Sequence, residues 1–232
     1  MTEMNDLFHS GVFAVLLTLL AYQVGLVCQK KFRSPVFNPI LIAVMVVLGV
    51  MVLTGLDLDT YRKGTASITW LITPATICLA VPMYEQTEIL KKNIRAIIAG
   101  IAAGVISCLA FVMLFSAVVG FDRMLTISLM PKSVTSAIGV PLVELYGGAG
   151  SITSPAIIIT GIIASVLSAP LSKILNIRDS VSMGVAMGTS GHVIATAKAG
   201  EIDPLTGAVS SLSLVIAGLL TSIVFPLAVS LL

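Results

Sequence analysis

The stretch MGTSGHVIATAKAGE, residues 187–201, lies where the surrounding sequence predicts a membrane-spanning helix. It places two glycines, a threonine, a serine and a histidine almost in succession, and it ends in a glutamate. A helix that breaks inside a bilayer leaves backbone N–H and C=O groups unpaired, at several kcal/mol each, unless protein or a water-filled cavity satisfies them. The stretch therefore predicts a broken helix that encloses something.

The composition of the 232-residue chain places it in a lipid bilayer. Hydrophobic residues make up 57% and charged residues 10%, and the mean hydropathy is +1.08. These charges are too few to cover a water-soluble globule of this size. Aromatic residues are only 6% and no strict alternation of apolar and polar residues is visible, so a helical bundle is predicted rather than a β-barrel. The net charge of +2 sits in short clusters and gives no support for a nucleic-acid partner.

Apolar runs of sufficient length predict an all-α integral membrane protein with about seven to eight transmembrane segments, because about 20 residues cross the hydrocarbon layer. The runs are 7–27, 38–54, 67–83, 94–119, 151–170, 180–198 and 205–231. One further piece, 124–146, is interrupted by Pro131 and Pro141 and is polar around Lys132, which predicts a re-entrant hairpin. No soluble domain is visible, so 1–232 is predicted to form one transporter-like domain.

The spacing of these segments predicts an inverted repeat of two halves, 7–121 and 122–232. Two broken stretches, 73–85 and 188–201, occupy similar positions in the halves, and each ends in a carboxylate. The loop after the first stretch carries a net charge of +1 and the loop after the second carries −1. Because positively charged loops stay in the cytoplasm, this change of sign favours opposite orientations of the two halves.

The broken segments and the polar hairpin predict an anion site near mid-depth, where helix N-termini and free amides would meet. Lys132 is the only cation far from a predicted membrane surface, so it could hold a carboxylate; the alternative is that its stem reaches the interface. His192 could bind an anion or exchange a proton, or it could satisfy a free carbonyl at the break. The predicted substrate-binding residues are Lys132, Ser133, Thr135, Thr76, Gly188, Thr189, Ser190 and His192.

The other polar residues have competing interpretations. The hydroxyl residues could instead join helices by packing and hydrogen bonds. His192, Glu85 and Glu201 are candidates for ion coupling, although a solvated loop carboxylate is an equal alternative for the two glutamates. The cysteines Cys28, Cys78 and Cys108 have no metal-ligand spacing and read as small core residues. Because no nucleophile, metal or phosphate-binding motif is present, the chain is predicted not to be an enzyme, and no metal or cofactor is expected.

Four stretches of the chain resemble the LrgB/CidB family of bacterial membrane proteins. They are LMPKSVTSAIGVPLVELYGGAGSITSPAIIITGI, GVAMGTSGHVIATAKAGEID, SPVFNPILIAV and ITPATICLAVPMYE. The resemblance runs from about Leu16 to Leu231, and the PKSVT and GTxxH motifs are its most specific parts. The chain departs from many relatives at Ala137, where they have proline, and at Ala195, where they have glycine. Both positions adjoin the predicted site.

The resemblance implies a multi-pass protein of the bacterial cytoplasmic membrane that pairs with a small LrgA/CidA-like membrane protein. The family was first described as modulating murein hydrolase export and autolysis. Its relatives include a plant plastidic glycolate/glycerate transporter and bacterial pairs linked to pyruvate uptake, and its plan is similar to that of elevator-like transporters. The resemblance carries function onto the residues of the two motifs, which are Lys132, Ser133, Thr135, Gly188, Thr189 and His192.

Two functions follow from the sequence. The first is alternating-access transport of a small monocarboxylate, such as pyruvate, glycolate or glycerate, together with the small membrane partner. The alternative is a holin/antiholin-like regulator of murein hydrolase activity and autolysis. The sequence favours the first, because broken helices and a buried lysine describe a saturable site. Expected partners are an organic acid, the lipid bilayer and the small partner protein; a homo-oligomer is left open.

Overall fold

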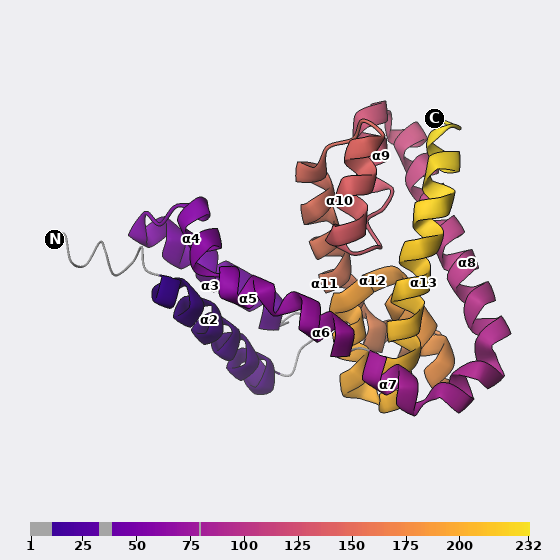
Figure 1. The fold of residues 1–232 in the computed structure, drawn as a ribbon, viewed down its shortest axis with the longest axis horizontal. Helices are drawn as coiled ribbons and strands as arrows, with labels where there is room; N and C mark the ends of the chain where they lie inside the picture. Colours follow the sequence, from indigo (N-terminus) through magenta and orange to yellow (C-terminus); the bar gives the residue numbers. More distant parts are fainter. Residues whose placement is uncertain (1–10, 33–38, 79) are drawn as a thin grey trace. The chain divides into compact units, whose positions relative to one another are not determined.

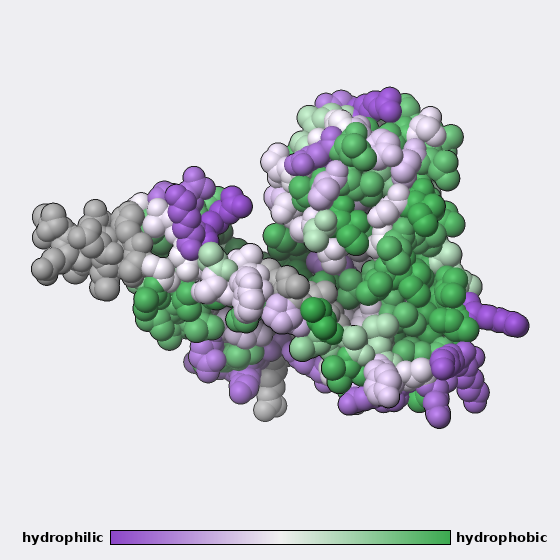
Figure 2. All heavy atoms as spheres, in the orientation of Figure 1, coloured by the Kyte–Doolittle hydropathy of each residue, from purple (hydrophilic) through white to green (hydrophobic). Residues whose placement is uncertain are grey.

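The computed structural model describes residues 11–32, 39–78 and 80–232, and every element in these ranges is a helix (Figure 1). The prediction of an all-α protein is confirmed. The chain divides into two compact units, Met1–Cys78 and Leu79–Leu232. Figure 2 shows hydrophobic residues along the sides of the second unit and hydrophilic residues gathered at its two ends, which is the surface of a protein that sits in a bilayer.

The first unit is built from two apolar helices that pack against each other. Leu17 and Ala21 of one helix and Val47 of the other form its core. The helices approach closely at Gly25, because a Cβ there would overlap the backbone of Pro39. The elements of this unit are α2 (Gly11–Phe32), α3 (Pro39–Thr54), α4 (Leu58–Gly64), α5 (Ala66–Trp70) and α6 (Ile72–Cys78).

The second unit contains three long helices and several shorter ones. Its elements are α7 (Ala80–Glu85), α8 (Thr87–Val119), α9 (Arg123–Leu129), α10 (Ser136–Leu145), α11 (Gly150–Ile174), α12 (Ser180–Ile202) and α13 (Pro204–Val229). The main core lies between α8 and α13, with Ile97, Ile101 and Phe225 fully buried. In the described ranges four helices are long and apolar enough to cross a bilayer, namely α2, α8, α11 and α13, and α3 is a shorter apolar helix. The expected count of seven to eight spans stays a prediction.

Residues 122–146 fold back on themselves as a helical hairpin. At its start, Arg123 Nη2 donates to Val229 O (3.4 Å) at the end of α13. At its end, the ring of Tyr146 packs against Phe225 of α13, with centroids 5.7 Å apart. The residues between α9 and α10 lie further back along α13, beside Ala217. Both ends of the hairpin therefore lie beside the C-terminal end of α13, as Figure 1 shows. Re-entry into the membrane stays a prediction.

A second hairpin is formed by α12. Its chain reverses at His192, whose backbone is not helical (φ 42°, ψ −138°). The two ends meet, because Ser180 Oγ donates to Asp203 Oδ2 (3.3 Å) and Thr206 Oγ1 donates to Ser180 O (3.4 Å). In a straight helix of this length the ends would be about 33 Å apart. Both arms pack on α13, and Thr196 Oγ1 on the second arm hydrogen-bonds Ser210 Oγ at 2.8 Å.

This geometry corrects one expectation and confirms another. The break in 187–201 is confirmed at His192. The expectation that 180–198 crosses the bilayer is wrong, because a segment whose two ends are hydrogen-bonded to each other returns to the side from which it came. The other stretch expected to be broken, 73–85, lies in the short helices α6 and α7, and residue 79 between them is outside the described residues. The single domain with repeat halves 7–121 and 122–232 stays a prediction. The two compact units are defined by contacts between residues, and such contacts do not test whether two halves are related by symmetry.

Asp203 joins the two ends of the second hairpin and caps α13. Its carboxylate accepts hydrogen bonds from the amides of Leu205 (2.9 Å) and Thr206 (3.0 Å) and from the Thr206 hydroxyl. Partial burial raises the pKa of Asp203, but the hydrogen bonds from Thr206, Leu205 and Ser180 outweigh it and hold the pKa below its ordinary value of 3.8. The ionised form is thus the one that the fold stabilises.

We expect Asp203→Ala to lower the free energy of unfolding by about 0.5–2 kcal/mol, the usual effect of losing an N-cap. Because the folded-state pKa is depressed, the stabilisation is present above about pH 4 and is lost as the pH falls through the folded pKa. Denaturant unfolding in detergent at several pH values, followed by circular dichroism, measures both effects. Exposed Glu201 at the end of α12 is the control, and Glu201→Ala should change little, because its ion pair with Lys198 lies at the surface. Equal stability of the Asp203→Ala and parent chains would contradict the capping role.

Candidate functional site

The tip of the first hairpin presents Lys132 and Ser133. The turn after α9 is closed by two backbone hydrogen bonds, from Lys132 N to Leu129 O (3.3 Å) and from Val134 N to Pro131 O (3.1 Å). Pro131 and Val134 are buried and anchor the turn. The two residues between them are half-buried. The proline and the valine therefore fix the position of the lysine.

Among the described residues, Lys132 has polar neighbours but no acidic one within ion-pair distance. Its Nζ lies 3.5 Å from Cys108 Sγ on α8 and 3.5 Å from Ser133 Oγ. Within the described ranges the structure contains one ion pair, between Lys198 and Glu201 at 2.7 Å. A charged lysine inside a bilayer costs about 2.5–3.5 kcal/mol on insertion scales, and it usually pairs or marks a substrate path. An incoming anion would supply the missing countercharge.

Two cavities meet at this lysine. One, of about 500 Å³, lies between α11 and α12, and the other, of about 590 Å³, lies between α8 and α12. Four residues line both cavities: Lys132, Ser133, Ala186 and Ser190. Both volumes are in the range of small-molecule sites, about 300–1,000 Å³. The two hairpins thus place one cation and two hydroxyl residues where the two cavities meet.

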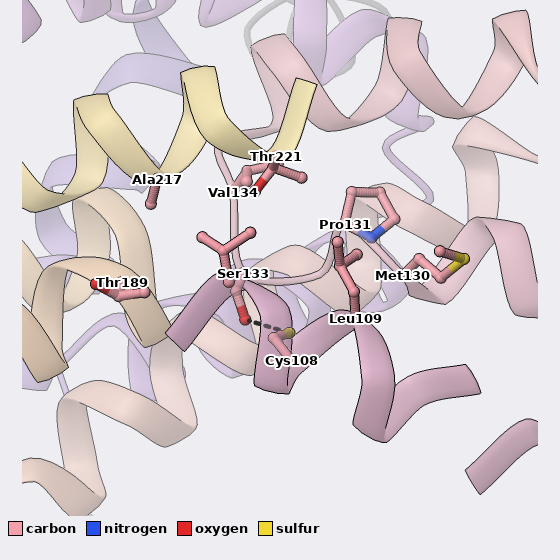
Figure 3. A pocket seen from close by; sticks show the side chains of 10 residues that line it. Cys108, Leu109, Met130, Pro131, Ser133, Val134, Thr189, Ala217 and Thr221 are labelled. Atoms are coloured by element: carbon pink, nitrogen blue, oxygen red, sulfur yellow. Dashed lines mark hydrogen bonds between the residues drawn. The ribbon is translucent and has the colours of Figure 1, made fainter. Parts of the chain in front are cut away.

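A third, much smaller space lies behind the tip (Figure 3). Its volume of about 10 Å³ is close to that of one water molecule. Ser133 Oγ and Cys108 Sγ are hydrogen-bonded at its edge at 3.4 Å. Thr189 enters it from α12, and its buried Oγ1 has no hydrogen-bond partner in the described ranges. A Cβ on Gly104 would lie 2.6 Å from Thr189 Cγ2, so the glycine lets α8 approach α12 here.

His192 lies at the tip of the second hairpin, facing α11. Its ring is 4% exposed, and Nε2 lies 2.9 Å from the backbone oxygen of Ile157. Gly161 makes room for it, since a Cβ there would lie 2.7 Å from the ring. His192 does not line the three cavities described above. This placement matches the interpretation in which the histidine satisfies a backbone carbonyl, although the carbonyl belongs to α11. Its part in binding or coupling stays a prediction.

The structure brings some of the predicted residues together and leaves others apart. Lys132, Ser133, Thr189 and Ser190 converge where the two hairpins meet. The rest are placed as follows: Gly188 is buried against α13; Thr135 holds the N-cap position of α10 without a side-chain cap; Glu85 is exposed at the end of α7; Glu201 is exposed and paired with Lys198; Thr76 belongs to the unit Met1–Cys78, and its side chain is outside the described part. Their predicted roles are untested.

Cys108 is the residue that the sequence analysis missed. A cysteine in an apolar run predicts a small core residue. The thiol of Cys108 instead contacts Lys132 and lines the cavity beside α8. Gly100, Gly104 and Cys108 are spaced by four, so they share one face of a helix. That spacing was the available signal, but it does not say what the face meets. Only the packing of α8 against the first hairpin shows that it faces the lysine.

These features define a class: a multi-pass helical membrane protein in which two helical hairpins meet at a lysine between two cavities. The chain belongs to the LrgB-like family, whose model matches residues 18–231. The match covers nearly the whole chain and confirms the predicted resemblance. No solved structure matches it.

Curated relatives are bacterial proteins named holin-like. The chain is 32% identical over 225 residues to "Holin-like protein CidB" of Staphylococcus epidermidis, with 96% of this chain and 97% of the relative covered. It is 31% identical over 223 residues to the protein of the same name in Staphylococcus aureus, with 96% and 97% covered. The chain is accordingly a multi-pass bacterial membrane protein of a holin-like family. Those names agree with the holin-like alternative and do not mention transport.

Proposed function

We propose that this chain carries a small monocarboxylate, such as pyruvate, glycolate or glycerate, across the bacterial membrane. One observation carries the proposal: two cavities share Lys132 as a lining residue, and this lysine has no ion-pair partner among the described residues. A carrier needs a binding site that can be reached from either side in turn. The carboxylate would bind Lys132 Nζ, and the Ser133 hydroxyl would donate a hydrogen bond to the carboxylate or to the hydroxyl or keto oxygen. The Ser190 hydroxyl donates to Ala186 O at 2.6 Å, so it would have to exchange that bond to donate to the ligand.

The helix that starts at the tip of the first hairpin supports anion binding. α10 begins one residue after Thr135, at the level of the lysine. Its N-terminal amides carry a partial positive charge that adds to the charge of Lys132. The second hairpin reverses beside the same place, so Ser190 and Thr189 approach from the opposite side. Both cavities flank the first arm of the second hairpin, so a movement of this hairpin would change access to the lysine from both of them.

The second candidate is the holin-like one, and the comparisons favour it over the carrier. The curated relatives at 31–32% identity are named holin-like. On this proposal the chain regulates murein hydrolase activity and autolysis, and its cavities are packing features or a path for passive leakage. A small LrgA/CidA-like membrane partner, or a second copy of the chain, would then complete the assembly. The carrier proposal includes the same partner.

Uptake into proteoliposomes distinguishes the two functions. We expect the chain to take up labelled pyruvate, glycolate or glycerate with saturable kinetics, and to retain a trapped fluorescent dye. The measurement is made with and without an inward proton gradient, and with and without the small partner. Vesicles that hold an unrelated helical membrane protein are the control.

Each outcome supports one of the proposed functions. Saturable uptake without dye loss supports the carrier. Uptake that requires the small partner supports a two-component carrier. Dye leakage without saturable uptake supports the holin-like function and excludes the carrier.

A further inference from the structure

The cavity between α11 and α12 extends well beyond the lysine. Its α11 side runs from Thr160 to Leu175, which is about 22 Å of helix at 1.5 Å per residue. Gly161 contacts the ring of His192, so the Thr160 end lies beside the tip of the second hairpin, where Lys132 and Ser190 line the cavity. The cation therefore lies at one end, and the rest of the cavity leads away from it.

The part that leads away from the lysine is apolar. On α11, Ile163, Leu167 and Leu171 follow one another at intervals of four residues and face the cavity. Met183 and Met187 of α12 line the opposite side, and methionine adapts readily to an alkyl chain. The cavity thus has one charged end and a long hydrophobic body.

Two serines in this wall do not make the body polar. Ser168 Oγ donates to Ser165 O (3.0 Å), and Ser172 Oγ donates to Ala169 O (2.9 Å). Their hydroxyl protons are therefore used inside α11, and neither serine has a free donor for a ligand in the cavity.

We infer that this cavity binds a monocarboxylate with an unbranched alkyl tail, a medium-chain fatty acid. The carboxylate pairs with Lys132, and the tail lies along Ile163, Leu167 and Leu171. The inference rests on the anion site proposed above, but it does not require transport. It widens the ligand class from two- and three-carbon acids to acids with a hydrophobic tail.

The proposed ligand has to fit both the charged end of the cavity at Lys132 and its apolar body along α11. A three-carbon acid satisfies the lysine but leaves most of the 500 Å³ unfilled. A hydrocarbon chain alone, such as a lipid tail, fills the body but leaves the lysine without a countercharge, which is costly inside a membrane. A fatty acid satisfies the charge and buries apolar surface at the same time.

Calorimetric titration of the full chain in phospholipid nanodiscs tests the inference. The probes are butanoate, hexanoate, octanoate and decanoate, with the corresponding alcohols as controls for partition into the bilayer. We expect the affinity to rise about fourfold per added methylene, equivalent to about 0.8 kcal/mol, until the tail fills the cavity. Alcohols should show only the partition seen with empty nanodiscs.

Three variants locate the two ends of the ligand. Lys132→Gln should reduce octanoate affinity at least tenfold. Leu167→Trp should fill the apolar body and abolish the dependence on tail length, while butanoate still binds. Ile159→Trp is the matched control, because Ile159 is exposed on the same helix and does not line the cavity, and it should bind as the parent does.

Equal affinity for all four acids would overturn the inference, as would a tail-length dependence that Leu167→Trp and Lys132→Gln leave unchanged. If Lys132→Gln does not fold, the tail-length dependence of binding can still be compared between Leu167→Trp and Ile159→Trp. Loss of this dependence in Leu167→Trp alone supports the inference, and its retention in both variants overturns it. Octanoate binding without uptake of any acid would exclude the carrier and support this site. Pyruvate uptake with no dependence of binding on tail length would support the carrier and exclude the fatty-acid site.

Discussion

Lys132→Ala is expected to abolish saturable uptake of small monocarboxylates while leaving the protein folded. Removing one partner of a desolvated charge pair costs about 2–5 kcal/mol, so kcat/KM for uptake should fall roughly thirtyfold to several-thousandfold. Folding should survive because Lys132 is half-buried and, among the described residues, makes two long hydrogen bonds, to Cys108 and Ser133. Initial rates in proteoliposomes, at matched protein content, give the result.

Two further variants show whether the charge and its position matter. Lys132→Arg keeps the positive charge with a different shape and should retain part of the uptake. Lys173→Ala removes an exposed lysine at the end of α11, and it should behave as the parent. Full uptake by Lys132→Ala would remove this residue from the site and leave the two cavities without an anion-binding group.

The largest effect on stability is expected from Gly188→Ala. Gly188 lies on the first arm of the second hairpin, where a Cβ would overlap the backbone oxygen of Ser210 and lie 2.8 Å from Ser213 Cβ. A backbone atom of α13 cannot move aside as a flexible side chain can, so the arm must shift. Overpacking of this kind costs about 1–3 kcal/mol. Unfolding in detergent, followed by circular dichroism, measures the loss.

Gly200→Ala provides the matched control. Gly200 lies on the second arm of the same helix and is exposed, and a Cβ there meets nothing within 4 Å. This variant should be as stable as the parent or slightly more stable, because alanine favours a helix over glycine by about 0.5–1 kcal/mol. Equal unfolding curves for Gly188→Ala and Gly200→Ala would show that α12 does not pack on α13 as described.

The two hairpins differ in how well they can be predicted from the sequence. Residues 124–146 contain Pro131, Pro141 and a cluster of polar residues, and the prediction of a hairpin rested on them. Residues 180–202 contain no proline and enough apolar residues to resemble a span. The reversal at His192 is accompanied by contacts between residues far apart in the chain: the hydrogen bond to Ile157 O of α11 and the hydrogen bond that joins Ser180 to Asp203. A local pattern cannot report such contacts.

The candidate site shows the same division. The sequence identified Lys132, Ser133, Thr189 and Ser190, because charged and hydroxyl residues are rare inside apolar segments and therefore stand out. It did not identify Cys108, because a cysteine in an apolar run is usually a small core residue. For His192 it left two interpretations open, a ligand-binding residue and a histidine that satisfies a backbone carbonyl; the ring faces α11 and bonds a backbone oxygen there, and its part in binding stays a prediction.

The sequence by itself determined that this protein lies in a lipid bilayer, that it is helical and which family it belongs to. Hydropathy, composition and motif spacing are properties of the chain alone. It also marked the break in the stretch 187–201, which the structure places at His192. Only the tertiary structure decided that α12 turns back instead of crossing, that Cys108 lies beside Lys132, and that two cavities share one wall. The physical reason is that these features depend on contacts between residues far apart in the chain, such as Ser180 with Thr206 and Lys132 with Cys108, which no local sequence pattern encodes.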